Sequence, residues 1–243
     1  MIEQQIAIPT KDGHTATFIV HPERGGPFPV ILFYMDAPAI REELRDMARR
    51  LATSGYYVML PNLYYRSGAM ELGALPADPN SPERKRMFQL MASLNIPLIM
   101  DDTRALLSYA EGQTAANTKI IGTVGYCMSG RYAINAATHF ADRVKAAASI
   151  YGTHLATDED NSPHLAAGKT KAELYFACAE ADIYAPPEMI AKVADSMKGA
   201  KAEVEIYPGT HHGFAFPKRP VYDRAAAERH WERLLALYRR NLV

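Results

Sequence analysis

Gly125-Tyr126-Cys127-Met128-Ser129-Gly130 is the stretch of the 243-residue chain that decides its fold. A β-rich apolar run, Ile120–Val124, precedes it, and a helix-capable segment, Arg131–Ala137, follows it. A strand, a tight turn with small residues and then a helix is the context of a nucleophile elbow, in which the central side chain stands exposed above a sheet. Because the turn is crowded, the residues that flank the nucleophile must be small, and Gly125, Ser129 and Gly130 meet this requirement. Cys127 therefore occupies the position of a nucleophile.

Strand-like and helix-like segments alternate almost throughout the chain. Apolar runs predict eight strands, at residues 5–9, 16–20, 29–34, 56–60, 120–124, 146–151, 173–178 and 204–207. Helical periodicity predicts helices between them and at the C-terminus, the first with an apolar stripe over residues 40–51. The first two strands flank an Asp-Gly turn, which is typical of an antiparallel hairpin. The later alternation predicts one α/β domain over residues 1–243, with a mainly parallel, doubly wound sheet of about eight strands flanked by helices.

Composition excludes several classes of function. The 27 Lys and Arg residues balance 27 Asp and Glu residues, so no global field favours nucleic acid or an anionic membrane. Two cysteines cannot form a disulfide framework, which favours a reducing cytosol. The N-terminus lacks the features of a signal peptide, and no apolar run approaches the ~20 residues of a membrane span. We therefore expect a cytoplasmic protein with a small-molecule partner and neither nucleic acid nor membrane; the oligomeric state is left open.

The loops after the last two strands offer partners for Cys127. Active residues gather at the carboxyl ends of parallel strands, which restricts the search. Glu180 and Asp182 follow one strand, and we favour Asp182 because it precedes a turn and a Pro-Pro helix start. His211 and His212 follow the next strand, and we favour His212 because the glycine after it permits a tight loop. The remaining histidines are interpreted as surface or structural residues.

The order cysteine, acid, histidine is the order that the α/β-hydrolase topology requires. A thiol with its reference pKa of ~8.5 is mostly protonated at neutral pH, so an imidazole must accept its proton. A carboxylate must then hold that imidazole and stabilise its cation. The N–H of Met128, at a helix N-terminus, is one candidate donor for an oxyanion hole, and the loop of residues 35–38 should supply the other. No spacing of carboxylates and histidines resembles a metal site, and we expect neither a metal nor a cofactor.

Over nearly its whole length the chain resembles the dienelactone hydrolase (carboxymethylenebutenolidase) family. Residues 125–130 resemble the family's Gly-Tyr-Cys-x-Gly-Gly elbow, with Ser129 in place of one glycine. Tyr207-Pro208-Gly209-Thr210-His211-His212-Gly213-Phe214 resembles its histidine motif and selects His212. Asp182 stands where the family keeps its acid, and Pro61-Asn62-Leu63-Tyr64 resembles the family's Pro-Asp-Leu-Tyr.

The resemblance implies an α/β-hydrolase fold and hydrolysis of an ester or lactone through an acyl-cysteine. It also implies a carboxylate that influences the thiol, at Asp36, and places the second oxyanion N–H on Ala37. Asp36 has an alternative interpretation as the N-cap of the helix that begins near residue 40. The family's type enzyme binds a substrate carboxylate with two arginines; Arg86 matches one, whereas Phe216 stands at the other. The nearby Lys218 and Arg219 are candidate substitutes for the missing arginine. The stretch around Arg86 is also typical of a solvated helix face.

Further substrate contacts are expected from Tyr64 and Arg66, in a loop after a strand, and from Phe214, beside the histidine; packing inside the protein is the alternative for Tyr64. Only some twenty residues separate Tyr151 from Ala172, which leaves no room for a large lid. The leading hypothesis is a hydrolase of small esters or lactones.

The alternatives are a general carboxylesterase or thioesterase, which Phe216 favours, and a non-catalytic binding protein on the same scaffold. Without a CxxC spacing, a thiol redox role is disfavoured. In the plainest alternative Cys127 is a buried structural cysteine, the interpretation that we give to Cys178.

Overall fold

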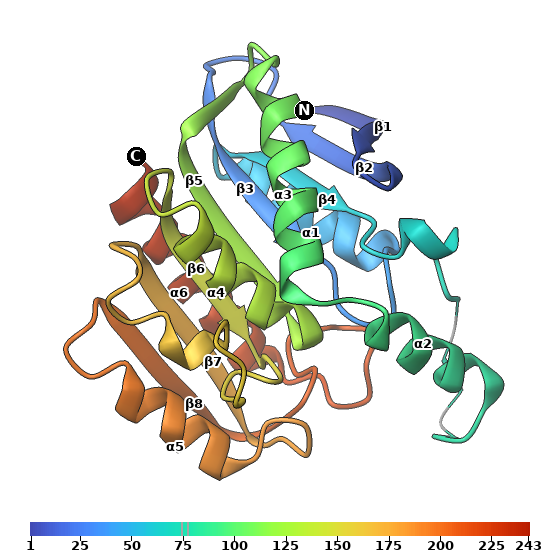
Figure 1. The fold of residues 1–243 in the computed structure, drawn as a ribbon, viewed down its shortest axis with the longest axis vertical. Helices are drawn as coiled ribbons and strands as arrows, with labels where there is room; N and C mark the ends of the chain where they lie inside the picture. The colour runs from blue at the N-terminus through green and yellow to red at the C-terminus, as the bar shows by residue number, and fades with distance from the viewer. Residues whose placement is uncertain (74, 77) are drawn as a thin grey trace. The chain divides into compact units, whose positions relative to one another are not determined.

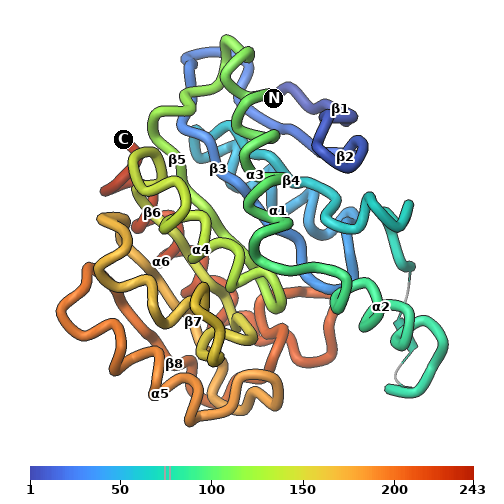
Figure 2. Tube along the Cα trace, in the orientation of Figure 1, coloured from blue at the N-terminus to red at the C-terminus, as the bar shows by residue number. Residues whose placement is uncertain are grey.

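A computed structural model describes residues 1–73, 75–76 and 78–243 of the protein. Residues 74 and 77 lie outside the described part. The chain divides into two compact units, an N-terminal unit of Met1–Thr118 and a C-terminal unit of Lys119–Val243. Figure 2 traces the chain through both.

Four strands form the sheet of the N-terminal unit, in the order β1-β2-β4-β3. β1 (Ile2–Thr10) and β2 (Gly13–His21) pair antiparallel around a tight turn, which confirms the predicted hairpin. β4 (Tyr57–Pro61) pairs antiparallel with β2 and parallel with β3 (Phe28–Tyr34). Apart from the first two residues of β3, every residue of β3 and β4 is buried, as expected for strands covered on both faces.

Helices α1 (Glu42–Thr53), α2 (Pro82–Ala92) and α3 (Ile96–Glu111) complete this unit, with a 3-10 turn, η1, at Tyr65–Ser67. The predicted apolar stripe of α1 is buried, and α1 packs against β2 and β4. Gly55 adopts the left-handed φ of 98° just beyond its C-terminal end, where a side chain would be strained. Asn95 caps α3 through a hydrogen bond from the Leu98 N–H (2.9 Å).

The C-terminal unit is built on β5 (Ala116–Tyr126), β6 (Val144–Ile150), β7 (Glu173–Ala181) and β8 (Ala202–His211). Neighbouring strands pair parallel throughout, in the order β5-β6-β7-β8. Because the strands are parallel, all four end at the same edge of the sheet.

Helices α4 (Gly130–His139), α5 (Pro187–Ser196) and α6 (Arg224–Leu242) cover this sheet, α4 and α6 on opposite faces (Figure 1), and η2 (Cys127–Ser129) and η3 (Pro163–Leu165) are 3-10 turns. Buried hydrogen bonds fix α6 to β5: the Tyr126 hydroxyl lies 3.0 Å from Nε2 of His230, and the Tyr238 hydroxyl donates to the Thr123 carbonyl. His230 is therefore a structural histidine, as expected.

The eight predicted strands and the helices between them are confirmed among the described residues. β8 is longer than expected, because it continues through Pro208 and Gly209 to His211 instead of ending at Tyr207. A register shift between Ala179 and Ala181 accommodates this extension beside β7. His212 consequently follows the strand end directly. Within the described chain, no helix combines the length and the apolar character needed to cross a membrane.

Candidate active site

One residue directly follows the end of each strand in the C-terminal sheet. Cys127 follows β5, Tyr151 follows β6, Asp182 follows β7 and His212 follows β8. Parallel pairing brings these four positions to a single edge. The sequence predicted three of them as a functional group, and the fourth is a tyrosine.

The turn at Cys127 is strained and crowded. Cys127 has φ of 57°, a left-handed conformation that is costly for a residue with a side chain. A Cβ on Gly125 would lie 2.0 Å from the Ser129 carbonyl oxygen, and a Cβ on Gly130 would lie 2.2 Å from Oγ of Ser149. The Thr153 N–H also donates to the Cys127 carbonyl (3.1 Å). The turn thus needs glycine on both sides of Cys127, as a nucleophile elbow does.

Asp182 and His212 form a buried ion pair across the ends of β7 and β8. Nδ1 of His212 lies 2.7 Å from Oδ2 of Asp182, whose side chain has no exposed surface. The other carboxylate oxygen accepts the N–H of Tyr184 (2.9 Å), which closes a tight turn after β7. The carboxylate therefore has a fixed position, and it fixes the orientation of the imidazole.

The pKa of His212 is strongly raised. Burial lowers the pKa, but the negative charges of Cys127 and Asp182 and the hydrogen bond to Asp182 outweigh burial and raise the pKa to about 9. Nε2 of His212 is buried and makes no hydrogen bond of standard geometry within the described chain, and the charge of Cys127 is the largest of the effects that raise the pKa. The imidazole is thus linked electrostatically to both the carboxylate and the thiol.

Two tyrosines that were not predicted to be functional flank the His212 ring. The Tyr151 ring meets the imidazole edge-on at a centroid distance of 5.0 Å, and the Tyr184 ring does so at 4.9 Å. Tyr151 is fully buried, with φ of 36°, whereas Tyr184 is partly exposed. The position of each tyrosine at or just beyond a strand end was the signal available in the sequence.

The rival residues of the sequence analysis lie apart from this pair. Nδ1 of His211 contacts the Ala181 carbonyl (3.2 Å), and the Glu180 carboxylate accepts the Gly209 N–H (2.8 Å). Cys178 is buried within β7, where burial and the charge of Asp182 raise its pKa to about 12. The geometry thus favours Asp182 and His212 over their neighbours and keeps Cys178 in its protonated form.

Three predicted residues of the N-terminal unit lie in a network of polar contacts. Asp36 does not cap α1, because the N-cap position belongs to Arg41 and no side chain caps it. The buried Asp36 carboxylate accepts hydrogen bonds from both terminal nitrogens of Arg41 (2.6 and 3.2 Å). The buried hydroxyl of Tyr64 donates to the carbonyl of Ala37 (3.0 Å), which ties the loop after β3 to the loop after β4.

The predicted arginines differ in their surroundings. Arg66 donates to both carboxylate oxygens of Asp102 and also pairs with Asp12, while its guanidinium stacks over Tyr65. The carboxylates of Asp102 and Asp12 thus bind the Arg66 guanidinium within the N-terminal unit, and they compete with any other anion for its charge. Arg86 lies on the exposed face of α2, as expected for a solvated helix.

Phe214 and Phe216 are core residues. Both are fully buried, and their rings pack against Tyr151, while Phe214 also stacks on Tyr207. We expected Phe214 to contact the substrate, but its side chain is buried and packs against the ring of Tyr151. The Arg219 guanidinium lies over the Phe216 ring (4.9 Å), and a Cβ on Gly213 would lie 2.8 Å from one of its terminal nitrogens.

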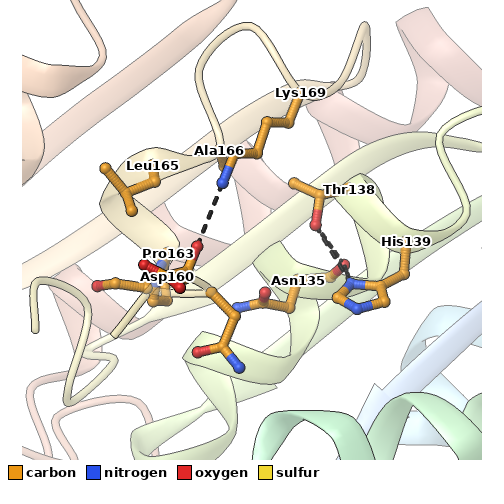
Figure 3. A pocket seen from close by; sticks show the side chains of 10 residues that line it. Asn135, Thr138, His139, Asp160, Pro163, Leu165, Ala166 and Lys169 are labelled. Carbon is orange, nitrogen blue, oxygen red and sulfur yellow. Dashed lines mark hydrogen bonds between the residues drawn. The ribbon is translucent and has the colours of Figure 1, made fainter. Parts of the chain in front are cut away.

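A separate pocket of about 250 Å³ lies between α4 and the segment of residues 160–169 (Figure 3). Asn135, Thr138 and His139 line one side, and Asp160 and Lys169 line the other. None of the three predicted catalytic residues lines this pocket. The part of the chain that the structure describes contains no group of three or more His, Cys, Asp or Glu residues placed to hold a metal ion.

An eight-stranded, mostly parallel sheet flanked by helices, with a strained elbow followed by an acid and a histidine, defines the α/β-hydrolase class. The model of the dienelactone hydrolase family matches residues 15–242, so the chain belongs to that family and is a hydrolase.

Related proteins agree with this assignment. A "Putative carboxymethylenebutenolidase" of Methylorubrum extorquens is 28% identical and covers 98% of this chain and 81% of its own length. The "Carboxymethylenebutenolidase" of Pseudomonas putida is 29% identical over 64% of this chain and 63% of its own. The crystal structure of a "Putative Dienelactone Hydrolase" from Klebsiella pneumoniae is 25% identical, covers 98% of both chains and has a TM-score of 0.86.

Proposed function

We propose that this hydrolase cleaves small esters or lactones through Cys127, with His212 as its acid and base and Asp182 as the residue that orients His212. One observation carries the proposal: Cys127 and Asp182 together raise the pKa of His212 to about 9 while Asp182 holds Nδ1. An imidazole coupled to a thiol on one side and a buried carboxylate on the other is the arrangement that nucleophilic catalysis needs.

The acylation step begins from a thiolate and an imidazolium. With a pKa of about 9, His212 is protonated at neutral pH and can donate a proton during this step. The sulfur attacks the carbonyl carbon and forms a C–S bond. When the tetrahedral intermediate collapses, the C–O bond breaks and His212 gives its proton to the leaving alcohol oxygen. The product is an acyl-cysteine beside a neutral imidazole.

Two backbone N–H groups would stabilise the oxyanion. Met128 follows the nucleophile in the turn that leads into α4, where the helix dipole also favours negative charge. Ala37 is the second proposed donor, on the strength of the sequence resemblance.

Deacylation restores the resting state with atoms and charges balanced. Neutral His212 takes a proton from water while the oxygen of that water attacks the thioester carbonyl. The C–S bond breaks, the carboxylic acid leaves, and the thiolate–imidazolium pair returns. Asp182 keeps Nε2 aimed at the reacting atoms through both steps. Two unpaired cysteines suit a reducing compartment, so we place this reaction in the cytoplasm.

Substitution of the nucleophile tests the proposal. Cys127→Ala should reduce the turnover of p-nitrophenyl acetate by at least ~10³-fold, while circular dichroism remains that of the wild type. Cys178→Ala is the matched control, because it removes the other cysteine, which is buried within β7, and should leave turnover nearly unchanged. Full activity in Cys127→Ala would reject the cysteine mechanism.

A second candidate concerns the substrate. Phe216, which stands at a family arginine position, is fully buried among aromatic rings and offers no charge to an acidic substrate. This observation favours a general carboxylesterase or thioesterase over a hydrolase of dienelactones. A panel of esters that differ only in whether the acyl group is acidic or neutral distinguishes the two candidates. A preference of at least tenfold for acidic substrates would reject the second candidate.

A further inference from the structure

Two exposed apolar residues directly follow the candidate acid in the chain, and the ring of the second, Tyr184, contacts the candidate histidine. Ile183 is 84% exposed and Tyr184 is 46% exposed, and both follow Asp182 in the loop between β7 and α5. Exposed apolar side chains next to a site can contact an apolar group of a ligand that binds there.

The loop that carries them is held at several points. The carboxylate of Asp182 accepts the Tyr184 N–H (2.9 Å), and its carbonyl accepts the Ala185 N–H (3.3 Å). The loop then enters Pro186 and the first turn of α5 at Pro187, where proline restricts the backbone. Ile183 and Tyr184 are therefore presented on a fixed turn.

The Tyr184 ring ties this surface to the chemistry, because its edge-on contact with His212 places it against the imidazole. An imidazolium that protonates the leaving oxygen must lie beside the alcohol portion of the ester, not beside its acyl portion. Side chains that lie next to His212 are therefore expected to contact the alcohol portion of the ester.

We propose that Ile183 and Tyr184 form an apolar wall that binds the alcohol portion of the substrate, so that esters of apolar alcohols are preferred over esters of small polar ones. This inference rests on the proposed function, since it takes His212 as the proton donor. Tyr184 has an additional role as a positioning residue, because its ring limits the rotation of the imidazole.

Two ester series test the wall. The alcohol series compares ethyl acetate with hexyl acetate, and the acyl series compares ethyl acetate with ethyl hexanoate. Ile183→Ser should lower the ratio of kcat/KM for hexyl acetate to that for ethyl acetate about five- to tenfold, mainly through KM, because apolar contact is lost. The ratio within the acyl series should stay within about twofold. An equal loss in both series, or none in either, would overturn the proposal.

Leu165→Ser is the matched control, since Leu165 is an exposed apolar residue (38%) of the same unit on η3. It should leave both ratios unchanged. Tyr184→Ala should lower kcat as well as raise KM for hexyl acetate, and Tyr184→Phe should restore both, because the ring and not the hydroxyl makes the contact. A Tyr184→Phe variant as impaired as Tyr184→Ala would contradict the positioning role.

Failure of the proposed function would look different, because the wild type would then hydrolyse neither series. The wall is in that case tested by the alkylation of Cys127 with iodoacetamide and with its N-hexyl derivative. We expect the hexyl reagent to react faster relative to iodoacetamide in the wild type than in Ile183→Ser. If the ratio of the two alkylation rates were equal in the wild type and in Ile183→Ser, the proposed apolar wall would be contradicted, whichever substrate the enzyme hydrolyses.

Discussion

At the scale of single residues, His212 is the side chain whose surroundings determine the chemistry. Its ring has a buried carboxylate at Nδ1, a thiol that acts on it electrostatically and a tyrosine edge on either side. All four groups lie around the ring, and the carboxylate and the thiol favour its protonated form. Removal of any one of them should change a measurable property of His212 itself.

Asp182→Asn should lower the pKa of His212 from about 9, because the variant loses the charge and the strong hydrogen bond at Nδ1. Turnover of p-nitrophenyl acetate should fall by the order of 10³-fold. NMR titration of the imidazole C–H and a steady-state assay measure the two effects. Glu180→Gln is the matched control, because the Glu180 carboxylate bonds only the Gly209 N–H among the contacts described. Equal losses in the two variants would contradict the assignment of Asp182.

The raised pKa of His212 also links stability to pH. The folded value of about 9 lies above the ordinary value of 6.5, so the protonated ring stabilises the folded state. This contribution, at most about 3 kcal/mol, is fully present below about pH 6.5 and is lost as the pH rises through about 9. Urea unfolding of the wild type and of His212→Asn measures it. The difference in free energy of unfolding should shrink between about pH 6.5 and about pH 10; a difference that grew would contradict the account.

At the scale of elements, the turn between β5 and α4 depends on the absence of side chains. A Cβ on Gly130 would lie 2.2 Å from Oγ of Ser149 and 2.7 Å from Cα of Gly152. Gly130→Ala should therefore destabilise the protein by about 2 kcal/mol or more, with loss of activity. Gly112→Ala is the control: its Cβ would approach nothing closer than 3.5 Å, so stability should be equal or slightly higher. Thermal unfolding compares them, and equal melting temperatures would show that the turn has spare room.

The same elements explain how much the sequence could predict. Apolar runs and helical periodicity predicted the strands and helices, and the rule that sites gather at strand ends led to Asp182 and His212. The full length of β8 was missed, because Pro208 and Gly209 are typical of a turn but here continue the strand. The ion pairs of Arg66 and the burial of Phe214 depend on contacts between distant segments, which no local pattern encodes.

At the scale of the whole molecule, the chain forms two compact units, yet the family match runs from residue 15 to residue 242 across their boundary. We therefore propose that residues 1–243 fold as one domain. Chemical unfolding followed by tyrosine and tryptophan fluorescence and by circular dichroism should give a single, coincident transition, because the units belong to one family domain. Two separated transitions would contradict a single domain.

The central claim is that the acyl group is carried by Cys127, and acid quenching of the wild-type reaction tests it most directly. Peptide mass spectrometry after rapid quenching with p-nitrophenyl acetate should find one acetyl group, on the peptide that contains Cys127 and at its sulfur. Carboxamidomethylation of Cys127 beforehand should abolish both the adduct and the turnover. An acetyl group on Ser129 or on another residue, or undiminished turnover after modification of Cys127, would contradict the account.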